Sequence, residues 1–226
     1  MFPLRDTIPS RSFPIVTFSL IIINSIVFGY ELYLGSGLDQ FLTSLGVTPV
    51  FYTQAWQENP LQLISGIAPL FSSLFLHGGW LHVISNMWYL WIFGDNVEDR
   101  TGHFRFLLFY LLCGILATLS HIILNPLSDI PTIGASGAIA GVMGAYFILY
   151  PRARIVTLFF LFIFIQIVEI PALFFLGLWI ILQVISGTLS IGLSNASGGV
   201  AWWAHIGGFL AGLISIFFFR KTRRRK

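Results

Sequence analysis

Residues 134–150 read GASGAIAGVMGAYFILY, an apolar run without a charged side chain that ends just before Pro151 and Arg152. As a helix, the fifteen residues from Ser136 to Tyr150 would be about 22 Å long at ~1.5 Å per residue. The hydrocarbon core of a bilayer is about 30 Å thick. With Pro151 and Arg152 at the cytoplasmic interface, we therefore expect Ser136 to lie several ångströms below the outer membrane boundary.

The segment before this run, NPLSDIPTIGA at residues 125–135, must then dip into the membrane to meet Ser136. Irregular backbone at that depth is tolerated only where it is buried in protein or lines a water-filled cavity. A wet cavity beside a serine is the environment that hydrolysis inside a membrane requires.

The composition of the whole chain agrees with a membrane protein. Of its 226 residues, 56% are apolar and 9% are charged, whereas soluble domains carry about 25% charged residues. We expect an all-α membrane protein, a bundle of six transmembrane helices that forms a single domain over residues 1–226. The predicted spans cover residues 13–33, 80–96, 104–124, 136–150, 172–193 and 202–219.

The twelve Lys and Arg residues set the predicted orientation, because cytoplasmic loops are enriched in both. With six spans and a cytoplasmic N-terminus, all twelve fall on the cytoplasmic side, as does the C-terminus. The predicted outer segments 34–79, 125–135 and 194–201 contain none. We interpret the basic tail 220–226 as a stop-transfer signal and a membrane-lipid anchor, and we expect no nucleic-acid partner.

A further apolar stretch, residues 155–170, reads IVTLFFLFIFIQIVEI. It is short for a span, lies between Pro151 and Pro171, and is rich in Ile, Val and Phe. These features predict a β-rich hairpin or an interfacial excursion at the cytoplasmic face. A crossing here would also reverse the direction of the last span.

Polar side chains inside the predicted spans converge at one depth. Such side chains are costly in a membrane, so each is a functional candidate. His82 and Asn86 are four residues apart and share one helix face. The predicted topology places both of them in the outer half of the membrane, together with Ser136 and His205.

Two pairs of glycines in the G-x-x-x-G pattern predict how these groups meet. Gly137 and Gly141 lie in the fourth span, and Gly208 and Gly212 lie in the sixth, on the face that carries His205. Such pairs allow close helix packing, although each pair by itself indicates only packing. Close contact would bring His205 within reach of Ser136, and a serine needs an adjacent base to become a nucleophile.

Several motifs together resemble the signature of the rhomboid family. They are HGGWLH at 77–82, followed by Asn86, then FGDNVE at 93–98, GASGA at 134–138 and AHIGG at 204–208. They occur in the family's order in the second, fourth and sixth spans, and the resemblance covers about residues 13–219.

The resemblance implies the six-helix rhomboid fold and a serine endopeptidase that cleaves transmembrane segments of other membrane proteins. It implies that Ser136 is the nucleophile and His205 the general base. His82 and Asn86 match the family's oxyanion-stabilising side chains, and the backbone N–H of Ser136 would join them. No cofactor and no metal are expected, because the sequence holds no metal-ligand cluster and no nucleotide-binding loop.

The chain departs from some relatives at two positions. Ala140 stands where an aromatic residue packs against the catalytic histidine, so we expect another group to hold the His205 ring. The first outer loop has Trp56 but lacks the Arg of a Trp-Arg pair, so its lipid contact must differ. Neither departure removes a group from the Ser136–His205 dyad.

Two other functions fit parts of the pattern. A non-catalytic relative could bind transmembrane segments, but it would not need both Ser136 and His205. A small channel or transporter would explain buried polar residues but not the motifs around them.

The absence of a transit peptide and the compact form predict a multi-pass protein of a prokaryotic plasma membrane. The natural substrate and the oligomeric state stay open.

Overall fold

The computed structural model of the chain describes residues 1–161, 164–191 and 200–221. Its longer helices are α1 (Ile15–Tyr33), α5 (Trp80–Thr101), α6 (His103–Leu124), α7 (Ser136–Leu149), α8 (Ala172–Ile191) and α9 (Trp202–Phe219). Shorter helices are α2 (Leu38–Leu45), α3 (Pro49–Glu58), α4 (Ile67–Ser72), η1 (Gly35–Gly37), η2 (Pro60–Ile64) and η3 (Ser73–Phe75). The strands are β1 (Phe2–Asp6), β2 (Arg154–Leu161) and β3 (Phe164–Pro171).

The six longer helices coincide with the six predicted spans, and the predicted helical membrane bundle is confirmed. Among the described residues, α1, α6, α8 and α9 are long and apolar enough to cross a membrane by themselves. Helix α5 meets the same criterion together with the segment Pro60–Phe75, from which it is bent by 81°. Helix α7 is apolar but shorter than the other spans, in agreement with its predicted length of about 22 Å.

Two span boundaries differ from the prediction. Helix α5 continues to Thr101, beyond the predicted end at 96, because its polar last turns are satisfied by other groups. The buried carboxylate of Glu98 accepts hydrogen bonds from the backbone N–H groups of Val16 and Thr17. The predicted end of the fifth span at 193 lies outside the described residues.

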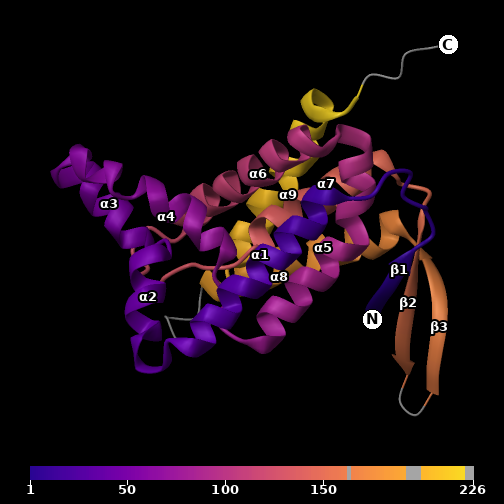
Figure 1. Cartoon of the computed structure of the whole chain (residues 1–226), viewed down its shortest axis with the longest axis horizontal. Coiled ribbons are helices and arrows are strands. Elements are labelled where there is room, and N and C mark those ends of the chain that lie inside the picture. The colour runs from indigo at the N-terminus through magenta and orange to yellow at the C-terminus, as the bar shows by residue number, and fades with distance from the viewer. Residues whose placement is uncertain (162–163, 192–199, 222–226) are drawn as a thin grey trace.

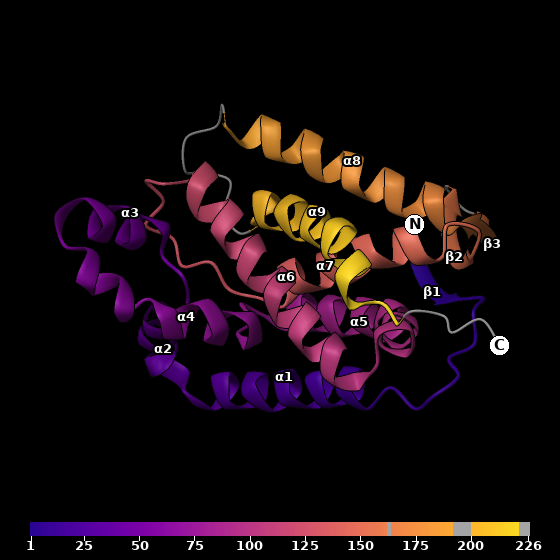
Figure 2. The ribbon, with the colours of Figure 1, turned by 90° about the horizontal axis from the view of Figure 1, so that it is seen from above.

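Helix α7 lies at the centre of the bundle, and every residue from Gly137 to Tyr146 is buried. Viewed from above, α1 runs along one side of the central helices and α8 along the other (Figure 2). A Cβ atom at Gly212 would lie 1.9 Å from the carbonyl oxygen of Gly141, and one at Gly208 would lie 2.0 Å from that of Gly137. The predicted close packing of the fourth and sixth spans through their glycine pairs is therefore confirmed.

The chain between α1 and α5 is more ordered than the sequence indicated. It was expected as an outer loop over residues 34–79, but it folds into the short helices η1 to η3 and α2 to α4. These helices project from one end of the bundle, and the strands project from the other (Figure 1). Short amphipathic turns of this kind have weak periodicity, which explains why the sequence did not reveal them.

The predicted hairpin over residues 155–170 is confirmed. Strands β2 and β3 pair antiparallel from Arg154↔Pro171 to Leu161↔Phe164, so the chain returns to the end at which it started. Strand β1 adds to the other edge of β2, with Phe2 opposite Leu158 and the order β1-β2-β3. The sequence did not predict this third strand, because its partner lies about 150 residues away along the chain.

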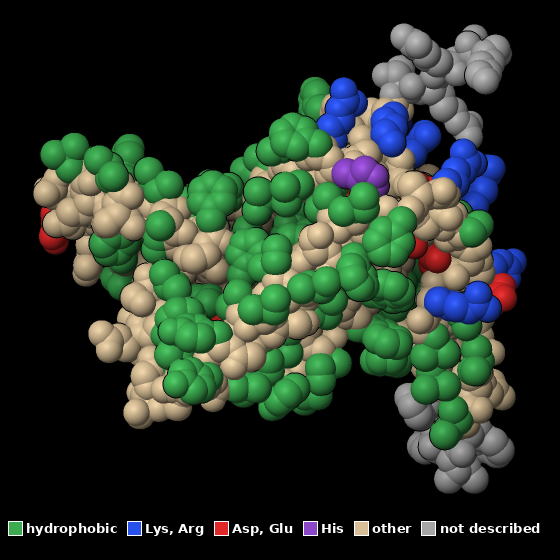
Figure 3. All heavy atoms as spheres, in the orientation of Figure 1, with side chains coloured by type: hydrophobic (Ala, Val, Ile, Leu, Met, Phe, Trp, Pro, Cys, Tyr) green, Lys and Arg blue, Asp and Glu red, His purple; other side chains and the backbone are tan. Residues whose placement is uncertain are grey.

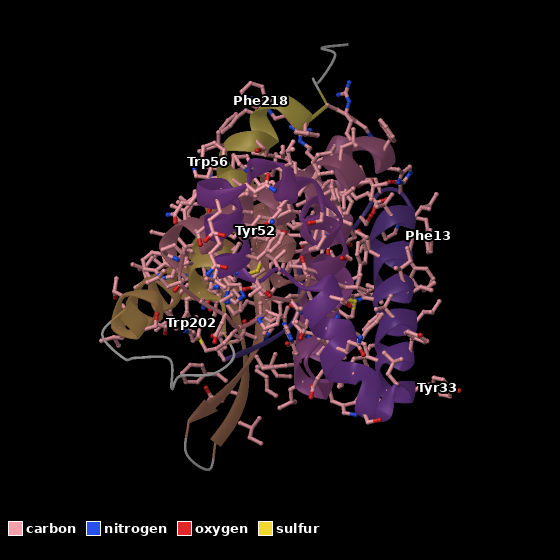
Figure 4. All side chains as sticks on the ribbon, turned by 90° about the vertical axis from the view of Figure 1, so that its left-hand side faces the viewer. Phe13, Tyr33, Tyr52, Trp56, Trp202 and Phe218 are labelled. Carbon is pink, nitrogen blue, oxygen red and sulfur yellow. The ribbon has the colours of Figure 1, made fainter. Side chains whose placement is uncertain are left out.

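The surface separates charged side chains from apolar ones, which agrees with the predicted orientation. The described Lys and Arg side chains gather at the end that carries the strands and the C-terminus, and hydrophobic side chains cover much of the bundle beside it (Figure 3). Phe13 and Tyr33 stand on the outside of α1 near its two ends (Figure 4), which is typical of aromatic residues at membrane interfaces.

The hairpin supplies a test of the orientation. Arg154 and Glu169 are both exposed at the base of the hairpin, 3.7 Å apart, and an exposed pair of this kind contributes little to stability. We expect single cysteines at either position, in a Cys113→Ala background, to react with a membrane-impermeant thiol reagent only from the cytoplasmic side. Labelling in sealed vesicles of both orientations measures this. Labelling of the two positions from opposite sides would show that the segment crosses.

Candidate active site

Ser136 is the first residue of α7, so its backbone N–H is one of those at a helix N-terminus that have no partner within the helix. The preceding turn is held by a hydrogen bond from the N–H of Gly134 to the carbonyl oxygen of Ser73, 2.8 Å long. Gly134 has a φ of +122°, and a Cβ atom there would lie 2.7 Å from the ring of His82. The glycine therefore allows the His82 ring to approach the turn that carries Ser136.

His205 lies in the first turn of α9, and its ring faces Ser136. The distance between His205 Nε2 and Ser136 Oγ is 2.9 Å, a normal hydrogen-bond length. The close packing of α7 and α9 described above brings the two residues together, because both stand near the N-terminal ends of helices that run side by side. The arrangement suits transfer of the serine proton to the imidazole.

Helix α8 and the first residue of α9 supply the other contacts of the His205 ring. The distance between His205 Nδ1 and Gln183 Oε1 is 2.8 Å, and Gln183 is buried. The ring of Trp179 lies 5.9 Å from the imidazole, and the ring of Trp202 lies 6.2 Å from it, centroid to centroid. The expectation that groups other than residue 140 hold the His205 ring is therefore confirmed.

His82 and Asn86 present donors from one face of α5. The backbone N–H of Gly78 points at His82 Nδ1 from 3.4 Å, an arrangement in which Nδ1 accepts and the proton resides on Nε2. The amide nitrogen of Asn86 is buried, and no acceptor for it exists in the part of the chain that the structure describes. Asn86 also lines the cavity described next, so its amide is placed to donate to a group that binds there.

These side chains line a cavity of about 710 Å³. Its wall includes Ile130, Pro131, Thr132 and Ile133, from the segment that was predicted to meet Ser136. A pair of backbone hydrogen bonds between Val47 and Thr132 ties this segment to the connection between α2 and α3. The described residues of the wall that carry polar side chains are His82, Ser85, Asn86, His121, Asn125, Ser128, Thr132, Ser136, Ser190 and His205.

The structure brings all four predicted site residues to this one cavity. Two residues of the site were missed from the sequence. His121 also lines the cavity, and Gln183 contacts His205; neither was singled out from the sequence. The criterion that selected the other four, a polar side chain within a span, would have selected Gln183 too, because it is the one amide in the run from 172 to 190.

The serine hydroxyl and the imidazole within hydrogen-bond distance lie beside a polar cavity in an apolar helix bundle, so the chain is a polytopic membrane protein with a Ser–His pair. A model of the Rhomboid domain matches residues 63–222. The chain therefore belongs to the rhomboid family, as its motifs indicated.

Individual relatives agree with this assignment. Rhomboid protein 1, mitochondrial, of Saccharomyces cerevisiae is 28% identical over 157 residues, which are 68% of this chain and 42% of that protein. Rhomboid protease GluP of Bacillus subtilis is 41% identical over 76 residues, 34% of this chain and 14% of that protein. The putative rhomboid protease YdcA of the same species is 36% identical over 77 residues, 34% of this chain and 38% of that protein. The chain spans less than half the length of each of these relatives.

Proposed function

We propose that the protein is an intramembrane serine endopeptidase that cleaves transmembrane segments of other membrane proteins. The observation that carries the proposal is the 2.9 Å contact between Ser136 Oγ and His205 Nε2 at the wall of a polar cavity. The match to GluP, which is named a rhomboid protease, supports the proposal. A non-catalytic function would leave this contact unexplained.

The reaction follows from the groups around the cavity. Ser136 Oγ attacks the scissile carbonyl carbon while its proton passes to His205 Nε2, and the negative charge moves to the carbonyl oxygen. The C–N bond then breaks, and His205 returns the proton to the leaving amine. Water attacks the resulting ester with His205 again as the base, which releases the acid and restores the Ser136 hydroxyl.

The proposed oxyanion site consists of His82 Nε2–H, Asn86 Nδ2–H and the backbone N–H of Ser136. Donors that are already oriented lower the energy of the developing charge without reorganisation. The N-terminus of α7 adds a favourable dipole at the same point. The apolar bundle around the cavity lowers the local dielectric constant, which strengthens each of these contacts relative to bulk solvent.

Family membership alone does not identify the membrane in which the protein resides. The relatives include mitochondrial and bacterial proteins, so membership identifies a multi-pass membrane protein and no particular compartment. We propose a prokaryotic plasma membrane with both termini cytoplasmic. The matches to two proteins of Bacillus subtilis and the gathering of basic side chains at one end support this proposal.

Substrate choice should depend on helix stability, because the peptide bond must leave its helix before Ser136 can reach it. With purified protein in liposomes, we expect a model substrate with two Gly residues near the outer membrane boundary to be cut faster than a poly-Leu segment, by about fivefold per Gly. Gel analysis of the fragments measures both rates.

A matched substrate with the same Gly pair at its cytoplasmic end is the control, and it should be cut as slowly as poly-Leu. Equal rates for all three substrates would contradict the requirement for local unwinding. No Ser136-dependent cleavage of any of them would contradict the protease assignment.

A further inference from the structure

Gln183 is a buried amide in the middle of the apolar helix α8. Hydrophobic packing alone does not explain a polar side chain at this position, and its contact with His205 does. The neighbours of Gln183 along the run ALFFLGLWIILQVI, residues 172–185, are apolar. Burial of an amide among them is costly unless it is hydrogen-bonded. Among the described residues, its one hydrogen-bond partner is the Nδ1 atom of His205, at 2.8 Å.

We propose that Gln183 is a positioning residue that sets the tautomer of His205 and supports its charged form during catalysis. This inference rests on the proposed function and deepens it. The dyad then has a neutral third member, an amide oxygen where other serine hydrolases place a carboxylate.

The tautomer follows from the donors and acceptors at the two ring nitrogens. Gln183 Oε1 can only accept a hydrogen bond, so the proton of neutral His205 must reside on Nδ1. Nε2 is then unprotonated and can take the proton of Ser136 from 2.9 Å. If the amide nitrogen faced Nδ1, the proton would move to Nε2 and His205 could not act as a base.

The same contact matters when His205 is protonated. The imidazolium carries a proton on both nitrogens, and the one on Nδ1 needs an acceptor in a buried site. Gln183 Oε1 supplies it without a charge. Trp179, one helical turn earlier on the same helix, lies 5.9 Å from the ring and limits its rotation, so α8 fixes both the plane and the protonation of His205.

Two substitutions separate this role from simple packing. Gln183→Leu keeps the volume and removes the acceptor, and we expect kcat to fall by about 10- to 100-fold with KM nearly unchanged, because a buried donor is left unpaired. Gln183→Glu places a carboxylate at Nδ1, which favours the imidazolium. His205 is then protonated up to a higher pH, so the acidic limb of the pH profile of kcat/KM should move up by about one unit or more.

The control variant is Val184→Ala, on the neighbouring, exposed face of α8, which should retain the wild-type kcat and pH profile. A second readout does not depend on activity. In ¹⁵N-histidine-labelled protein, with His205→Ala to assign the signal, we expect the Nδ1–H tautomer of His205 in the wild type and a mixture in Gln183→Leu.

Wild-type kcat in Gln183→Leu, an unmoved acidic limb in Gln183→Glu, or an Nε2–H tautomer in the wild type would each overturn the role of Gln183. Failure of the proposed function has a different signature, because a protein without Ser136-dependent cleavage would still give the Nδ1–H spectrum if the contact with Gln183 sets the tautomer.

Discussion

Purified Ser136→Ala and His205→Ala variants should each lose cleavage of a model transmembrane substrate, with rates lower by about 10⁴- to 10⁶-fold. Without Ser136 Oγ no ester intermediate can form. Without His205 the hydroxyl keeps its proton, because no other base lies within hydrogen-bond distance of Ser136 Oγ among the described residues. The two losses should not multiply in the double variant, since both groups serve the same step.

The fold should survive these changes. Ser136 and His205 line the cavity, so their truncation enlarges a space that is already open. His205→Ala also removes the hydrogen-bond partner of Gln183, so this variant should be the less stable of the two. Thermal unfolding within a few degrees of the wild type would confirm that both variants fold. Ser25→Ala is a matched control, because Ser25 lies on α1 and donates a hydrogen bond to the carbonyl oxygen of Ile21 in its own helix. It should retain full activity.

The second large effect concerns the oxyanion donors. Asn86→Ala should lower kcat by about 100- to 1000-fold and change KM little, because the donor matters most when charge develops on the carbonyl oxygen. His82→Ala should act in the same direction. The double variant should lose less than the product of the two single losses if both donors bind one oxygen.

Asn24→Ala provides the comparison for a buried amide elsewhere in the bundle. Asn24 is fully buried on α1 and donates to the carbonyl oxygen of Leu20, so its loss should reduce stability and leave kcat unchanged. Steady-state kinetics over a range of substrate concentration in liposomes separates kcat from KM. Wild-type turnover in Asn86→Ala would reject the oxyanion role, and a change confined to KM would assign Asn86 to substrate binding.

The sequence predicted the parts of the fold that depend on local pattern and composition. Long apolar runs mark membrane helices whatever their neighbours, and the G-x-x-x-G pairs at 137/141 and 208/212 carry a packing rule of their own. The hairpin over 155–170 was predicted from its Ile, Val and Phe content and from the direction that the last span needs. Each of these signals is contained within a short segment.

The parts that could not be predicted depend on contacts between distant segments. Residues 2–6 form strand β1 because they pair with the free edge of β2. The five residues of β1 carry no sequence signal that identifies this distant partner. Helix α5 runs on to Thr101 because Glu98 is satisfied by the start of α1. The contact of Gln183 with His205 joins two helices across 22 residues, and only the packing of α8 against α9 determines which polar groups meet.

The central claim, that His205 activates Ser136 as a nucleophile, is tested most directly by a fluorophosphonate probe. Attack by Ser136 Oγ on phosphorus displaces fluoride, and the adduct can be located by mass spectrometry of the proteolysed protein. We expect one adduct, on Ser136, in the wild type and a strongly reduced yield in His205→Ala at equal protein and probe concentrations. An unmodified Ser136 beside an adduct at another residue, or equal labelling in the His205→Ala variant, would contradict the account.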